Sequence, residues 1–89
     1  MLIDLNTESA DLELGCDVCV IGAGAVGLVL AIDLARKAMR VCLLEGGGVR
    51  LQPESQDLHR GFSVGHPFRN IEVGRYRVLG GTTTFWAAR

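Results

Sequence analysis

A glycine-rich turn between an apolar run and a stretch of helical periodicity constrains this sequence more than any other feature. The apolar run CDVCVI, residues 16–21, has the composition of a strand buried on both faces and leads directly into GAGAVG. From Ala25 to about Ala38, apolar residues recur at the spacing of one helix face, and basic residues mark the end. VCLLE, residues 41–45, is a second strand-like run. Strand, helix and strand within about thirty residues predict a βαβ unit with parallel strands.

Three glycines of this turn follow the pattern G-x-G-x-x-G, and each has its own physical role. Gly22 permits the tight turn, Gly24 lets a diphosphate approach the backbone, and Gly27 allows the helix to lie close to the strand. The free amides at the helix start, from Ala25 onward, favour a diphosphate without any side-chain charge. Glu45 follows Gly27 by eighteen residues, where a carboxylate accepts hydrogen bonds from ribose hydroxyls and repels a 2′-phosphate. The pattern predicts dinucleotide binding and favours FAD or NAD over NADP.

The fold class expected from these patterns is α/β, with a Rossmann-like βαβ unit for FAD or NAD(P) that belongs to an incomplete doubly wound parallel sheet. The predicted organisation is an acidic arm over residues 1–15, the βαβ unit over 16–45, and a cofactor-contacting excursion over 46–89 that ends in LGGTT. Two strands and one helix cannot cover both faces of a parallel sheet. We therefore interpret the chain as an N-terminal fragment or truncated product that retains FAD weakly or not at all.

The residues after Glu45 help to separate the two dinucleotides. Gly46, Gly47 and Gly48 are either a place where the backbone passes close to an adenosine or a flexible loop. Pro53 to Arg60, closed by Gly61, is predicted to form a short helix, and a short strand is possible around Ile71 to Val73. A third helix and strand do not follow promptly, as they would in an NAD-binding half, so the layout favours a flavoprotein.

Two separated motifs carry a family resemblance. DVCVIGAGAVGLVLAIDLARKAMRVCLLEGGG and, later, GHPFRNIEVGRYRVLGGTTTFW resemble the N-terminal part of the glucose-methanol-choline (GMC) family of FAD-dependent oxidoreductases, most closely its sugar oxidase and sugar dehydrogenase branch. The resemblance covers residues 16–86. It implies a cofactor-binding set in which the first glycine motif holds the diphosphate, Glu45 holds the adenosine ribose, and the second motif runs past the flavin. These residues are Gly22, Gly24, Ala25, Gly27, Glu45, Gly46, Arg77, Gly80, Gly81 and Thr82, with Thr83 and Trp86 as further candidates.

The resemblance also implies the reaction, which is hydride transfer from an alcohol or sugar hydroxyl to the flavin N5. Some relatives carry a flavin-linked histidine where this chain has Phe85, so a non-covalent FAD is expected. The family places its catalytic histidine in a later part of a longer chain, so no catalytic residue is assigned here. His59 and His66 are interpreted as solvated or capping residues, and Trp86 as a packing residue. The alternatives are a fragment of an NAD-dependent dehydrogenase and a truncated product without activity.

Charge and composition exclude several other classes of protein. The net charge is −1, and residues 46–89 carry six arginines against three acids, which suits a small anionic ligand rather than a nucleic acid. The longest uncharged stretch, Val18 to Ile32, is too short and too rich in glycine for a membrane span, and an acidic segment precedes it, which argues against a signal peptide. A cytoplasmic location is the expectation. Cys16, Cys19 and Cys42 require no disulfide. Cys19 lies in an apolar run and is interpreted as a small buried hydrophobic residue, and a structural role without a metal site is expected.

Overall fold

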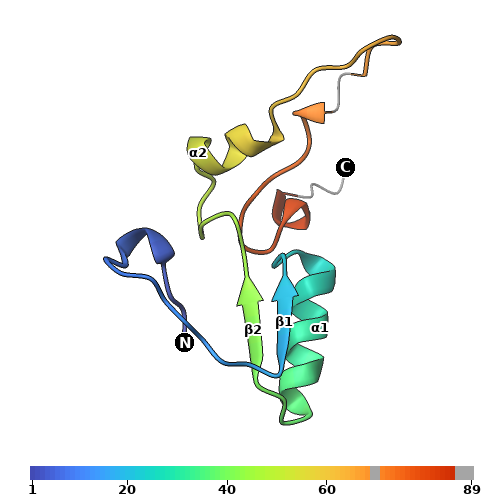
Figure 1. The fold of residues 1–89 in the computed structure, drawn as a ribbon. Coiled ribbons are helices and arrows are strands. Elements are labelled where there is room, and N and C mark those ends of the chain that lie inside the picture. The colour runs from blue at the N-terminus through green and yellow to red at the C-terminus, as the bar shows by residue number, and fades with distance from the viewer. Residues whose placement is uncertain (69–70, 86–89) are drawn as a thin grey trace.

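The structure is a computed structural model that describes residues 1–68 and 71–85. It contains two strands, two α-helices and short 3-10 helices (Figure 1). In chain order these are η1 (Leu5–Thr7), β1 (Val18–Ile21), α1 (Ala25–Arg36), β2 (Val41–Leu44), α2 (Pro53–Gln56), η2 (Asp57–His59) and η4 (Thr82–Phe85). The predicted strand, helix and strand are confirmed, and the fold is α/β with one Rossmann-like βαβ unit. No helix in the described ranges is long and apolar enough to cross a membrane.

The two strands are parallel and in register, and α1 covers one face of the sheet. Val18 pairs with Val41 and Ile21 with Leu44, and the Gly22 amide extends the ladder by donating to the Leu44 carbonyl at 2.7 Å. Among the residues that the structure describes, four form the buried core: Val20, Ala23, Ala31 and Val78. Both strands point toward α2 and the C-terminal segment, which lie beyond the carboxyl ends of the strands (Figure 1).

Asp17 and Arg40 form an ion pair at the amino ends of the two strands. The Asp17 carboxylate accepts hydrogen bonds from the Arg40 backbone amide at 2.8 Å and from its guanidinium at 3.1 Å. The Asp17 amide in turn donates to the Arg40 carbonyl at 2.8 Å. The Arg40 side chain and then the Arg40 amide lower the pKa of Asp17 below its ordinary value. Residues 17 and 40 thus align the first residues of both strands.

The first helix ends in a left-handed residue that is not glycine. Helix α1 stops at Arg36, and Ala38 adopts φ 62°. The Met39 amide donates to the Leu34 carbonyl at 3.3 Å, and the Ala38 amide donates to the Ala35 carbonyl at 3.0 Å. This is the Schellman hydrogen-bond pattern, which normally uses glycine because a Cβ is strained at positive φ. The absence of glycine at this end of the helix, visible in the sequence, therefore has an energetic cost.

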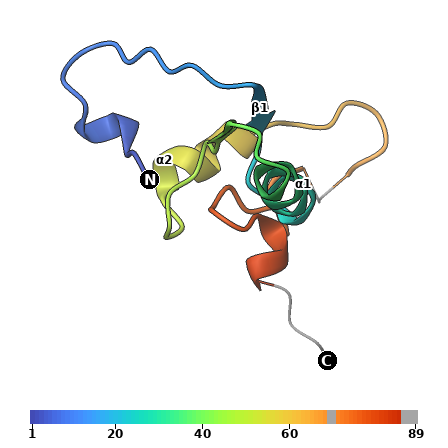
Figure 2. The same cartoon turned by 90° about the horizontal axis from the view of Figure 1, so that it is seen from below.

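The sheet face opposite α1 is largely exposed in the part of the chain that the structure describes. Ile21 is 84% exposed and Leu44 43%, and Cys19 is exposed as well, so its predicted burial is wrong. The radius of gyration is 15.7 Å, compared with about 12 Å for a compact domain of this length. The open layout is clear in Figure 2, where the N-terminal arm and the loop after α2 extend away from the βαβ unit. Exposed apolar strands, as predicted, are the consequence of a single covering helix.

The segment after Glu45 follows the prediction in part. The expected helix from Pro53 forms as one α-helical turn in α2 and continues as η2, with Arg60 capping its end. The strand suggested around Ile71 to Val73 is wrong, because Ile71 has 3-10 geometry, Glu72 lies in a turn and Val73 in a bend. The Glu72 carboxylate accepts from the Gly61 amide at 2.9 Å, and no third strand lies in the described ranges to pair with this segment.

Candidate cofactor-binding site

The first glycine turn has the geometry that its pattern predicts. Gly22 adopts φ +100°, a conformation that side chains rarely permit. A Cβ on Gly27 would overlap the Gly22 carbonyl oxygen and would also contact the Val20 side chain at 3.6 Å. The missing side chain at residue 27 is thus what allows α1 to lie against the end of β1.

The amino end of α1 presents free amides next to open space. The first intrahelical bond runs from the Leu28 amide to the Gly24 carbonyl at 2.9 Å, so the amides of Ala25, Val26 and Gly27 have no acceptor within the helix. Gly24 is the N-cap and makes no side-chain cap. A Cβ built on Gly24 meets no described atom within 4 Å. This combination of free amides, helix dipole and open approach fits a diphosphate group.

Glu45 connects the first glycine turn to the glycine loop that follows β2. One carboxylate oxygen accepts from the Ala23 amide at 2.8 Å and the other from the Gly47 amide at 2.8 Å. Each carboxylate oxygen has a second acceptor position, so these contacts leave capacity for ribose hydroxyls. The side chain is partly buried, and the two amides fix its orientation.

The part of the second motif that spans residues 77–82 lies directly against the first glycine turn. The Gly80 amide donates to the Ala23 carbonyl at 2.8 Å, and the Leu79 amide donates to the Gly48 carbonyl at 2.9 Å. A Cβ on Gly81 would lie 2.9 Å from the Gly24 Cα. Segments more than fifty residues apart in the sequence therefore meet at the carboxyl edge of the sheet.

The first two glycines after Glu45 accommodate Arg77, and the third, Gly48, faces the Gln52 side chain. A Cβ on Gly46 would overlap the Arg77 guanidinium, and a Cβ on Gly47 would overlap the Arg77 backbone carbonyl. From the sequence, Gly46 to Gly48 were expected to form either a flexible loop or a passage for adenosine. Neither interpretation included this packing against Arg77. The Arg77 Nε is enclosed and has no hydrogen-bond partner among the described residues. A buried guanidinium nitrogen without a partner is costly, and an anion would satisfy it.

The threonines of the second motif mostly bond to their own segment. Gly80 and Gly81 adopt φ of 93° and 69°, which turns the chain into η4. The Thr82 hydroxyl accepts from the Tyr76 amide at 3.0 Å, and the Thr83 hydroxyl donates to the Gly80 carbonyl at 3.0 Å. These hydroxyls stabilise the turn itself. Trp86, a further sequence candidate, lies outside the described residues.

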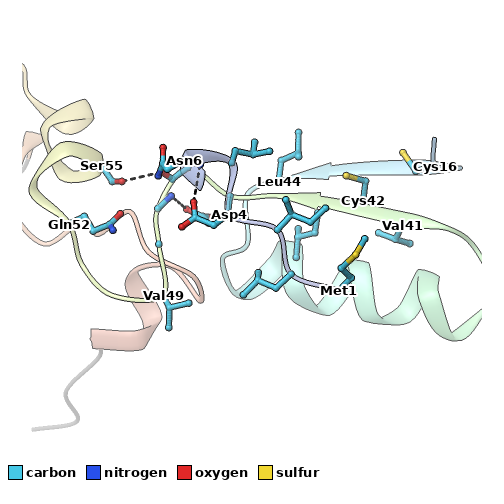
Figure 3. Close-up of a pocket in the computed structure, with 18 of the residues that line it drawn as sticks. Met1, Asp4, Asn6, Cys16, Val41, Cys42, Leu44, Val49, Gln52 and Ser55 are labelled. Atoms are coloured by element: carbon cyan, nitrogen blue, oxygen red, sulfur yellow. Dashed lines mark hydrogen bonds between the residues drawn. The ribbon is translucent and has the colours of Figure 1, made fainter. Parts of the chain in front are cut away.

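A cavity of about 830 Å³ lies between the N-terminal arm, β2 and the loop after it. Figure 3 shows Met1, Asp4 and Asn6 of the arm together with Val41, Cys42 and Leu44 of β2 around this cavity. A second cavity of about 370 Å³ shares part of this lining and reaches Ala23 and Leu79. Glu45 lines both. The space beside the Glu45 carboxylate is therefore large enough for an adenosine-sized group.

The comparisons with known proteins agree with this geometry. Residues 17–55 match the family model described as FAD dependent oxidoreductase. The cofactor is FAD. The match includes β1, α1, β2 and the start of α2, and thus Gly22, Gly24, Gly27 and Glu45, whereas the second motif lies beyond it. Neither the comparison with curated proteins nor that with solved structures finds a match.

The FAD-binding unit also depends on residues that the sequence reasoning did not select. Ala23 is fully buried and uses both backbone groups, one with Glu45 and one with Gly80. Gln56 bonds to the segment that carries Arg77. No sequence signal marks Gln56, whereas the small residue between Gly22 and Gly24 could have indicated a crowded position at Ala23.

Proposed function

We propose that this chain is the FAD-binding N-terminal portion of an oxidoreductase of the GMC type, which oxidises an alcohol or sugar hydroxyl. The observation that carries the proposal is the hydrogen bond of 2.8 Å from Gly80 to Ala23. It brings the second motif of the GMC resemblance against the first glycine turn, as two parts of one cofactor site require. The sugar branch of the family is proposed on the RYRVLGGTTTFW run alone.

We assign each part of the cofactor to different residues of the site. We assign the diphosphate to the free amides of α1 around Ala25, with Gly22 and Gly24 leaving room for its approach. Glu45 accepts hydrogen bonds from the adenosine ribose in the adjoining cavities. Arg77 supplies a positive charge, and its side chain is half-buried. The attraction of a partly buried charge to an anion is stronger than the attraction of the same charge in water. The flavin side of the cofactor is assigned to Gly80, Gly81 and Thr82.

FAD supplies a two-electron acceptor for a hydride from a carbon that bears a hydroxyl group. The described residues of this chain bind and orient it, and we assign none of them to proton removal from the substrate. His66 is exposed, as a solvated role predicts. His59 is half-buried with an enclosed Nε2, and it stands at the end of η2 rather than beside the glycine turn.

A fluorescence anisotropy titration of the purified chain tests cofactor binding. FAD and NADH are titrated separately, and ADP is then added as a competitor for the shared adenosine site. We expect weak, saturable FAD binding that ADP reverses, because the diphosphate and ribose contacts belong to the ADP half. Tighter binding of NADH than of FAD would favour the nicotinamide-dependent class, and FAD binding that ADP leaves unchanged would contradict the assigned site.

The substrate class is tested on the FAD-saturated chain by absorption spectroscopy. A molecule that binds beside the flavin shifts its visible bands, so sugars and simple alcohols are compared with amino acids of similar size. A shift with sugars or alcohols alone is the expected result. A shift with amino acids alone would assign the chain to oxidation of amines and contradict the proposed hydroxyl donors.

A further inference from the structure

The side chain of Gln56 bonds to two backbone groups of the segment that carries Arg77. Its amide nitrogen donates to the Arg75 carbonyl, and its amide oxygen accepts from the Arg77 N–H at 3.2 Å. The carbonyl of one residue and the N–H two residues later point the same way along an extended chain. A neighbouring residue in a parallel sheet would bond to this same pair of groups. Gln56 therefore replaces a strand neighbour that the segment lacks in the described ranges.

The position of Arg77 is fixed from both sides. After it in the chain, Leu79 and Gly80 are held by the Gly48 and Ala23 carbonyls. Before it, the described bonds to the backbone of this stretch come from Gln56 and from the Thr82 hydroxyl, which accepts from Tyr76. Without Gln56, the bond between the Tyr76 amide and the Thr82 hydroxyl would be the described backbone bond that remains before Arg77.

The neighbour of Gln56 on α2 holds the surface against which Arg77 lies. The Ser55 hydroxyl donates to the Gly46 carbonyl at 3.1 Å, and Gly46 is the residue that the Arg77 guanidinium covers. Consecutive residues of one short helix thus fix the two parts of this contact. The enclosed, unpartnered Nε of Arg77 shows that the contact does not itself satisfy the guanidinium within the described chain.

We propose that Gln56 is a positioning residue, which holds the Arg77 guanidinium where it meets the cofactor diphosphate. The inference deepens the proposed function and rests on it. Only an amide of this length offers both a donor to the Arg75 carbonyl and an acceptor to the Arg77 N–H. Glutamate has the length but no donor, and leucine has neither. These two replacements therefore remove one bond and both bonds, respectively.

The test combines Gln56→Leu, Gln56→Glu and Arg77→Gln with the double variant Gln56→Leu/Arg77→Gln. Glu54→Leu is the matched control, since Glu54 is an exposed residue of the same helix with no hydrogen bond among the described residues. Loss of two hydrogen bonds is expected to weaken FAD binding by about tenfold in Gln56→Leu. Gln56→Glu should lie between this variant and the wild type, and Glu54→Leu should bind as the wild type does.

The double variant distinguishes positioning from a general effect on folding. If Gln56 acts through Arg77, the double variant binds FAD no more weakly than Arg77→Gln alone. The salt dependence of the FAD affinity then falls equally in Gln56→Leu, Arg77→Gln and the double variant. Additive losses, or an unchanged salt dependence in Gln56→Leu, would overturn the proposal. Far-UV circular dichroism identifies a variant that fails to fold, in which case Gln56→Glu decides the question in place of Gln56→Leu.

Hydrogen exchange of the Arg77 amide provides a readout that needs no cofactor. It should exchange faster in Gln56→Leu, with the amides of β1 unchanged. An unchanged Arg77 amide would refute the contact. A wild-type chain that binds no FAD would overturn the role of Gln56 toward the diphosphate, while faster Arg77 exchange would still establish that Gln56 holds the segment.

Discussion

The Glu45 carboxylate, at the end of β2, accepts a hydrogen bond of 2.8 Å from the Ala23 amide in the first glycine turn. Its other oxygen accepts from the Gly47 amide. One side chain thus ties together the two loops between which we place the cofactor. The contact gives Glu45 a structural role in addition to its proposed role at the ribose.

Replacing Glu45 with glutamine should therefore weaken the fold even without FAD. The glutamine amide nitrogen is a donor and would face one of the two backbone N–H groups, leaving that N–H unsatisfied at a cost of about 1–3 kcal/mol. Thermal unfolding in the absence of cofactor measures this loss, and FAD titration should show weaker binding. Glu54→Gln, at an exposed position of α2, is the control. An unchanged unfolding curve for Glu45→Gln would show that the two amides do not depend on the carboxylate.

Alanine at Gly24 and alanine at Gly27 should separate cofactor binding from folding. A methyl group at Gly27 would overlap the Gly22 carbonyl, and overpacking of this kind costs about 1–3 kcal/mol of stability. At Gly24 the φ is −80° and the position is open, so stability should change by less than about 1 kcal/mol. The Gly24 methyl group would instead block the approach of the diphosphate.

Unfolding and FAD titration of the same two variants test this difference. Gly24→Ala is expected to unfold much as the wild type does and to bind FAD more weakly, whereas Gly27→Ala should lose stability first. Wild-type affinity in Gly24→Ala would place the diphosphate elsewhere.

Glycine at Ala38 should stabilise the chain. Ala38 adopts φ 62° at the end of α1, and left-handed backbone costs a residue with a Cβ about 1–2 kcal/mol. The greater freedom of glycine in the unfolded chain offsets part of this, so Ala38→Gly is expected to gain about 0.5–1 kcal/mol. Ala35→Gly, at the last-but-one residue of α1, should lose up to about 1 kcal/mol. Chemical denaturation of the two variants should move in opposite directions.

Stability should depend on pH through Asp17. The Arg40 side chain and amide lower the pKa of Asp17 from its ordinary 3.8 in the folded chain. The stabilisation from this group is therefore fully present above 3.8 and is lost as the pH falls through the lower, folded pKa. Asp17→Asn should be less stable than the wild type at neutral pH, and the difference should shrink below pH 3.8. A difference that stays constant down to strong acid would contradict the pairing.

FAD that is bound to this chain should be released by acid precipitation. Under the proposed GMC assignment, Phe85 stands where some members of that family carry a flavin-linked histidine. Its ring packs on Tyr76 with centroids 4.5 Å apart. A phenyl ring offers no atom for a covalent link to the flavin. Flavin fluorescence should therefore appear entirely in the acid supernatant, and fluorescence retained by the precipitated protein would show a covalent link through another residue.

Much of the βαβ unit could be read from the sequence, because its signals are local. Alternation of apolar runs, glycines and helical spacing located β1, α1 and β2 to within about two residues, and the family match over residues 17–55 agrees with FAD. The spacing of Gly22, Gly24 and Gly27 required only a strand before and a helix after, both of which the pattern supplied. The positive φ of Ala38 at the end of α1 is seen only in the structure, because a left-handed residue there is normally signalled by glycine.

The tertiary structure alone decided how the two motifs share one site. Gly46 and Gly47 lack side chains because Arg77 packs there, Gln56 substitutes for a strand beside Arg75 and Arg77, and Ala23 joins Glu45 to Gly80. Patterns along a sequence report a residue's neighbours within a turn or a strand, since the backbone sets those distances. Contacts between segments twenty to sixty residues apart depend on how the chain folds back on itself, and that is fixed only when the segments pack.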